Sequence, residues 1–118
     1  MCVKVGEKML KDGDYAQAEQ VFVHALTMDN KNPKLYNYLG MTYYRLRKYD
    51  QALVSYKNAV SLNKRFSFAY FNMGDVLFEL GDLDNAMKYY RMAISMNPAL
   101  KRKNRPFFLG QIVRQVKY

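Results

Sequence analysis

The sequence has one cysteine, one histidine, six glycines and three prolines among 118 residues, and these shortages exclude several classes of protein. A single cysteine forms no internal disulfide, and one cysteine with one histidine cannot complete a structural zinc site. The few glycines supply no phosphate-binding glycine-rich loop, and half of the residues are hydrophobic, so the chain is neither fibrous nor disordered. No apolar run approaches the roughly 18 residues that a membrane helix needs.

No set of residues suitable for catalysis is present either. His24 follows Val23 and precedes Ala25, which indicates a surface or packing residue, and Cys2 has no catalytic motif around it. The paired aspartates, which stand where turns are expected, are typical helix caps. They are Asp12 with Asp14 and Asp82 with Asp84. We therefore predict a protein that is not an enzyme and binds no metal or cofactor.

What the sequence does contain is an internal repeat of 34 residues. The positions in phase are Gly6, Gly40 and Gly74; Ala18, Ala52 and Ala86; Ala25, Ala59 and Ala93; and Phe22, Tyr56 and Tyr90. Apolar residues within the unit recur every three or four positions, which is the spacing of one helix face. Each unit is thus predicted to be two amphipathic helices, and its small residues remove bulk where the helices cross. The expected helices span 1–12, 15–28, 33–46, 49–62, 67–80, 83–96 and 105–117.

Two local features define the ends of these helices. Asn32 is a suitable N-cap, and Pro33 fits the first helical position because it needs no N–H partner there. The turns carry Gly13 and Gly81, whereas the middle unit carries Arg47. If this turn requires a positive φ, we expect Arg47 to be strained.

The repeat resembles the tetratricopeptide (TPR) family, whose signature is an aromatic-x2-L-G-x2-Y segment followed by A-x3-F, A and P. The matching residues are Tyr36, Leu39, Gly40, Tyr43, Ala52, Tyr56 and Ala59, then Tyr70, Met73, Gly74, Leu77, Ala86, Tyr90, Ala93 and Pro98. The resemblance implies an all-α, right-handed superhelical solenoid forming a single domain over 1–118. Its parts are a truncated repeat (1–32), two complete repeats (33–66 and 67–100) and, after a small insertion within 101–104, a terminal helix (101–118) that begins a fourth repeat.

In TPR proteins the first helix of each pair lines a concave groove, so the resemblance also implies a set of peptide-binding residues. They are Lys34, Asn37, Tyr38, Met41, Tyr44, Arg45, Phe68, Phe71, Asn72, Asp75, Phe78 and Glu79, with Val3, Glu7, Leu10 and Lys11 from the truncated repeat. Tyr38, Phe68 and Phe71 are the expected anchors, while Tyr44 and Phe78 are either groove or partly core.

Some TPR domains bind the C-terminal carboxylate of large heat-shock chaperones through lysine, asparagine and arginine in this groove. The corresponding residues here are Val3, Glu7, Tyr38, Phe68 and Asn72, of which only Asn72 fits. That function is not supported.

The net charge of +9 is concentrated in two segments. Residues 33–66 carry seven basic residues against Asp50 alone, and residues 101–118 carry six basic residues and no acid. The sharpest basic cluster is Lys101, Arg102, Lys103 and Arg105. This distribution favours an acidic partner or is simply a solvated surface.

We therefore expect a non-catalytic interaction module, a scaffold or adaptor, that binds a short peptide or helix in its groove, with Lys34 and Arg45 favouring an acidic ligand. Two alternatives stay open: self-assembly into a homo-oligomer through the repeat ends, and binding of nucleic acid or an anionic membrane through the basic segments. Residues 1–8 lack an apolar signal core, which predicts a cytoplasmic protein if the chain is complete. A start midway through a repeat is equally typical of a piece cut from a longer protein.

Overall fold

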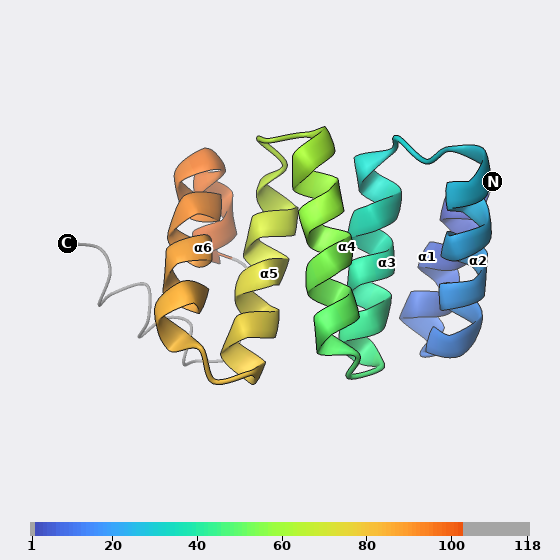
Figure 1. The fold of residues 1–118 in the computed structure, drawn as a ribbon, viewed down its shortest axis with the longest axis horizontal. Helices are drawn as coiled ribbons and strands as arrows, with labels where there is room; N and C mark the ends of the chain where they lie inside the picture. Colours follow the sequence, from blue (N-terminus) through green and yellow to red (C-terminus); the bar gives the residue numbers. More distant parts are fainter. Residues whose placement is uncertain (1, 103–118) are drawn as a thin grey trace. The chain divides into compact units, whose positions relative to one another are not determined.

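The structure, a computed structural model, describes residues 2–102, and every element in that range is helical (Figure 1). The elements are α1 (Cys2–Asp12), α2 (Tyr15–Met28), α3 (Pro33–Arg45), α4 (Tyr49–Leu62), α5 (Ser67–Glu79), α6 (Leu83–Met96) and the 3-10 helix η1 (Pro98–Arg102). All six predicted α-helices within this range are confirmed to within one residue at their ends. The helix expected over 105–117 lies outside the described residues.

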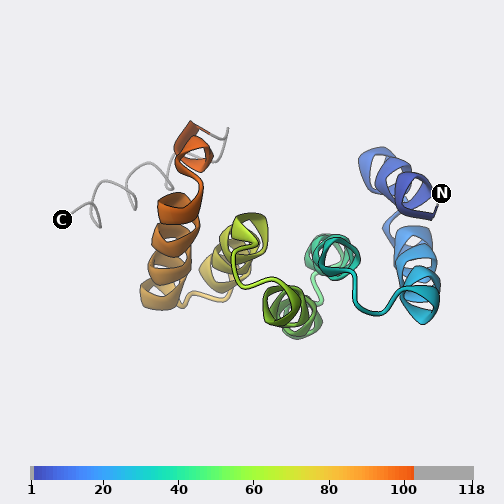
Figure 2. The same cartoon turned by 90° about the horizontal axis from the view of Figure 1, so that it is seen from above.

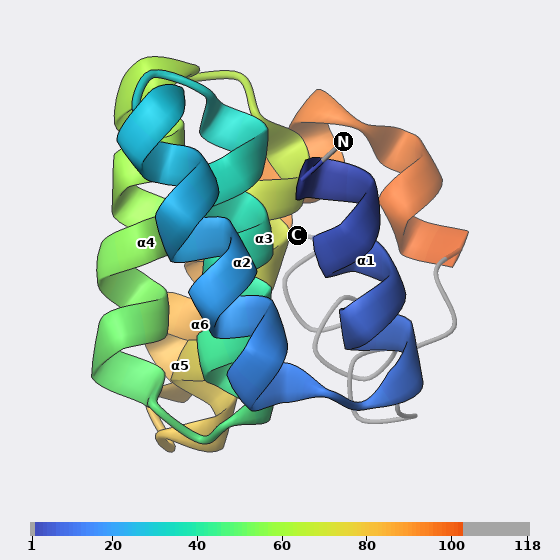
Figure 3. The same cartoon turned by 90° about the vertical axis from the view of Figure 1, so that its right-hand side faces the viewer.

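The helices form two compact units, which meet at a repeat boundary in the sequence: Met1–Phe66 and Ser67–Tyr118. In the first unit α2 packs on both α1 and α3, and α3 packs on α4. Figure 3 shows α1 and α2 running side by side in opposite directions, and Figure 2 shows α3 beside α4. In the second unit α5 packs on α6, and η1 returns against α6. The fold is an all-α helical repeat.

One contact recurs in each helix pair, where a glycine of the first helix meets an aromatic ring of the second. A Cβ atom added to any of these glycines would come within 2.4–2.7 Å of the ring, closer than packed atoms allow. The pairs are Gly6–Phe22, Gly40–Tyr56 and Gly74–Tyr90. The three rings are buried. The glycines are therefore explained by packing, and the predicted loss of bulk at the helix crossing is confirmed.

Each unit has its own apolar core. In the first unit a buried cluster joins α2 to α3 through Phe22, Ala25, Leu35 and Leu39, with Ala18 fully buried beside them. In the second unit α5, α6 and η1 share a cluster whose members are Phe71, Ala86, Tyr90, Ala93 and Leu100. Burial of such side chains is the main force that holds helical repeats together, at roughly 25 cal/mol per Å² of apolar surface.

The turns and caps largely follow the sequence. Gly13 and Gly81 have φ values of 84° and 83°, and Arg47 takes the same left-handed conformation with φ 62°. The Asn32 side chain accepts a hydrogen bond from the Lys34 amide at 3.0 Å, as an N-cap should. Among the expected aspartate caps, Asp82 accepts from the Asn85 amide at 3.4 Å, whereas the side chain of Asp14 makes no cap hydrogen bond.

No helix within residues 2–102 has both the length and the apolar character needed to cross a lipid bilayer.

The glycine–ring contact gives a first prediction. Gly40→Ala should lower the free energy of unfolding by about 1–3 kcal/mol, because the new methyl group would meet the buried Tyr56 ring 2.5 Å away. Denaturant unfolding measures the effect. The same substitution in a Tyr56→Leu background should cost less, since the ring is gone. Unchanged stability of Gly40→Ala would contradict the packing explanation.

Arg47 gives a second prediction. Arg47→Gly should stabilise the protein by about 0.5–1 kcal/mol. The left-handed conformation costs a residue with a side chain about 1–2 kcal/mol, and glycine avoids this cost. Part of the gain is lost because glycine makes the unfolded chain more flexible. Arg45→Gly is the matched control, since it removes the same charge at the last residue of α3, where φ is not positive. That variant should gain no stability and lose at most about 1 kcal/mol. Thermal unfolding distinguishes the two.

Candidate functional site

Four of the predicted groove residues lie along one side of α3. Lys34, Tyr38, Met41 and Arg45 are spaced by four, three and four residues, which places them within a narrow angle of each other at about 100° per residue. Lys34 and Arg45 are exposed, whereas Tyr38 and Met41 are half-buried. We call this set the Tyr38 stripe. It combines two cations with a partly accessible apolar centre.

Tyr38 is held in place from two directions. Its ring stacks on Phe22 with the centroids 5.5 Å apart and the planes 5° from parallel. Its hydroxyl donates a 2.8 Å hydrogen bond to Oε2 of Glu7, which links α3 to α1. Burial, followed by this hydrogen bond and the charge of Glu7, raises the pKa of Tyr38 from 10.0 to about 12. The phenol is therefore neutral and rigidly oriented at ordinary pH.

Asn37 and Tyr44, the other groove residues expected on α3, differ from the stripe. Asn37 is only 8% exposed, with its Nδ2 3.8 Å from the Met41 sulfur, so the expectation that it lines an open groove is wrong. Tyr44 is half-buried and packs against Tyr49 across the turn, with ring centroids 5.8 Å apart.

The largest correction concerns Phe71, an expected exposed anchor in the second unit. Its side chain is 1% exposed and its ring lies 5.0 Å from that of Tyr90, inside the core that Leu100 also completes. The reason is its place one turn before Gly74, where α5 approaches the same Tyr90 ring most closely. Asn37 stands in the same relation to Gly40.

The remaining expected residues of α5 are divided between surface and core. Phe68 is 42% exposed, and Asn72 and Asp75 are half-buried. Asp75 accepts a 2.6 Å hydrogen bond from the Tyr90 hydroxyl, so its carboxylate supports the helix pair. Phe78 is half-buried against the core of the second unit, which agrees with its alternative as a partly core residue.

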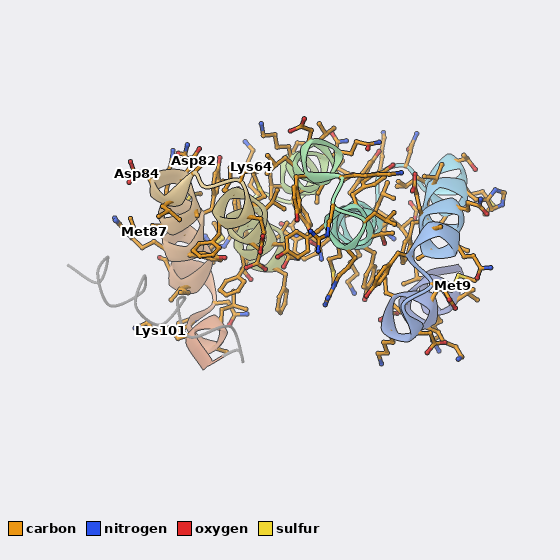
Figure 4. All side chains as sticks on the ribbon, turned by 90° about the horizontal axis from the view of Figure 1, so that it is seen from below. Met9, Lys64, Asp82, Asp84, Met87 and Lys101 are labelled. Atoms are coloured by element: carbon orange, nitrogen blue, oxygen red, sulfur yellow. The ribbon has the colours of Figure 1, made fainter. Side chains whose placement is uncertain are left out.

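The basic cluster is only partly within the described residues. Lys101 and Arg102 belong to η1, and Lys101 is exposed (Figure 4). Lys103 and Arg105 lie outside the described residues. Within residues 2–102, no group of three or more histidine, cysteine or acidic side chains is arranged to hold a metal ion, and His24 is exposed.

One feature of the first unit was not predicted: a pocket of about 330 Å³ between α3 and α4. Its lining residues are Tyr36, Leu39, Tyr43, Asp50, Gln51, Val54, Ser55 and Asn58. The three α3 residues belong to the repeat signature and were therefore assigned to packing alone. Among these lining residues, Val54 is a hydrophobic side chain that is 58% exposed.

Tyr38 gives a prediction on pH. Because folding raises its pKa, the stabilisation from its neutral form is fully present below about pH 10 and is lost as the pH rises through about 12. Tyrosine NMR signals of the folded protein, assigned with Tyr38→Phe, should show Tyr38 titrating near pH 12. Glu7→Gln should lower this pKa without bringing it to 10, since burial remains. A Tyr38 that titrates near 10 in the wild type would contradict the structure.

Comparisons with known proteins agree with this architecture. The tetratricopeptide repeat model matches residues 33–66 and 67–100, which together make up more than half of the chain. A comparison with curated protein sequences gives no significant match.

Several solved structures are similar. The first TPR domain of human RPAP3 is 26% identical, with 96% of this chain and 85% of that chain covered and a TM-score of 0.82. The first TPR of Spaghetti (RPAP3), bound to the HSP90 peptide SRMEEVD, is 27% identical, with 98% and 90% covered and a TM-score of 0.80. MamA is 24% identical with a TM-score of 0.79; 86% of this chain matches it, spanning 59% of the MamA chain. By its repeats and its fold, the chain belongs to the tetratricopeptide repeat family.

Proposed function

We propose that the chain is a non-catalytic interaction module that binds an acidic peptide along α1 and α3 and thereby acts as an adaptor. The observation that carries this proposal is Tyr38, which Glu7 and Phe22 hold rigidly between the exposed cations Lys34 and Arg45. A fixed aromatic ring loses little conformational entropy when a ligand packs against it, which is why such rings concentrate binding energy.

The spacing of the stripe suggests how a ligand would lie. Lys34 and Arg45 are eleven residues apart, or about 16 Å along the helix axis at 1.5 Å per residue. Carboxylates near the two ends of a short peptide would pair with these cations. The segment between them would cover Tyr38 and Met41, and the flexible methionine adapts to different side chains.

The comparison with the first TPR of Spaghetti (RPAP3) supports peptide binding, because that domain holds the acidic peptide SRMEEVD. The present chain differs at the positions that would receive a peptide's terminal carboxylate. Glu7 places a negative charge there and is engaged by Tyr38 at 2.8 Å. We therefore propose that its ligand is an internal acidic segment and not a chain terminus.

The proposal predicts that Lys34→Glu/Arg45→Glu weakens binding of acidic peptides by about tenfold or more, because two attractive charge pairs become repulsive. The assay is fluorescence anisotropy of the whole chain with a panel of acidic heptapeptides, including SRMEEVD with a free and with an amidated C-terminus. The two forms should bind equally if the terminus is not recognised.

The matched control is Lys31→Glu/Lys57→Glu, which changes the net charge equally at two exposed residues outside the stripe. It should retain most of the affinity. Equal losses in both double variants would mean non-specific attraction, and no binding of any panel peptide to the wild type would also reject the proposal. If the apparent affinity for the peptides fell as the protein concentration rose, self-association of the chain would be competing with peptide binding.

A further inference from the structure

The pocket between α3 and α4 opens on the side of α3 opposite the Tyr38 stripe. At about 100° per residue, Tyr36, Leu39 and Tyr43 point about 140–200° away from Lys34. The other wall comes from α4. A ligand in this pocket would thus leave the stripe accessible, and the two surfaces could be occupied together.

The walls of the pocket are mainly apolar and aromatic. Leu39 and Ser55 are buried, Tyr36 and Tyr43 are half-buried, and Val54 is exposed. The volume of about 330 Å³ is at the lower end of the range for ligand pockets, about 300–1,000 Å³. That suits one long side chain of a partner better than a large ligand.

The charge of the pocket is opposite to that of its surroundings. Asp50 lines it and is the only acid among residues 33–66, which carry seven basic residues. Its place in the first turn of α4 is favourable by itself, because an acid there interacts with the helix dipole. The helix dipole accounts for Asp50 alone, and the same pocket adds two phenol rings of the repeat signature and the exposed Val54.

The chain itself already places a cation on one of these rings. The Lys48 ammonium lies 5.9 Å from the centroid of the Tyr43 ring and 3.2 Å from a carboxylate oxygen of Glu19. Aromatic faces attract cations at such distances, and lysine and arginine combine an apolar stem with a charged head. Tyr36 offers a second ring of the same kind in the pocket.

We propose that this pocket binds a single lysine or arginine side chain of a partner protein. The charged head of that side chain would meet Asp50 beside the Tyr43 end of the pocket, and its stem would lie against Leu39 and Val54 toward Tyr36. The chain's net charge of +9 disfavours a polybasic segment, so the residues flanking this lysine or arginine would be neutral. The protein would then join an acidic ligand on one side of α3 to a partner with one exposed cation on the other.

The test is an NMR titration of the whole 15N-labelled chain with capped single amino acids. N-acetyl-lysine and N-acetyl-arginine methylamides should shift the signals of Tyr36, Tyr43 and Val54 in a saturable way. The norleucine analogue has the apolar stem without the charge and should bind at least about threefold more weakly, as should the glutamate analogue. Equal binding of norleucine, or stronger binding of glutamate, would overturn the proposal.

Two variants test the pocket itself. Asp50→Asn should weaken lysine binding by about threefold or more, while Asp84→Asn should not. Asp84 is the counterpart of Asp50 in the next repeat, extends outward from the start of α6 (Figure 4), and there Lys88 replaces Val54. Val54→Lys should abolish binding without unfolding, because the residue is exposed. Absence of any saturable shift in the wild type, or equal effects of Asp50→Asn and Asp84→Asn, would overturn the proposal.

Discussion

The contact between a glycine and an aromatic ring within each helix pair is the constraint on which the rest of the structure depends. It brings the two helix backbones close enough for one ring to fill the space between them, and it recurs with the repeat period of 34 residues. A larger residue at the glycine would separate the helices and open the cores described above. The distance between the helices of a pair therefore depends on one residue without a side chain, which is Gly40 in the second repeat.

With that distance fixed, the sides of α3 have different surroundings. Leu35 faces the core shared with α2, and Gly40 faces Tyr56 of α4. Two further sides remain accessible in part, one with Tyr38 and one with Tyr36. Because they point in nearly opposite directions, a ligand on one does not block the other. The proposed acidic ligand on one side and the proposed lysine or arginine on the other are matched in charge by Arg45 and Asp50 respectively.

The sequence predicted the repeat and the helices, and it marked Arg47 as the residue to be strained if its turn required a positive φ, because periodicity and turn chemistry are local properties of a chain. The burial of Phe71 was missed, since periodicity shows which side of a helix a residue occupies but not what covers that side. Here the cover comes from Tyr90 and from Leu100 of η1, an element that the sequence analysis did not predict. The pocket was missed through the reverse error. Tyr36 was assigned to packing because it belongs to the repeat signature, but how far its ring stays accessible depends on the neighbouring helices.

The spacing of the cations on the Tyr38 stripe makes recognition depend on geometry as well as charge. Lys34 and Arg45 are about 16 Å apart along the helix, which is twice the screening length of about 8 Å at physiological salt. Each cation therefore acts as a separate contact and contributes little to a common field. A ligand gains from both only if its acids have matching spacing, about five residues apart in an extended segment or about eleven in a helix. A random polyanion meets this condition only in part, so the ligand that we propose for the Tyr38 stripe is a defined peptide and not any chain of negative charges.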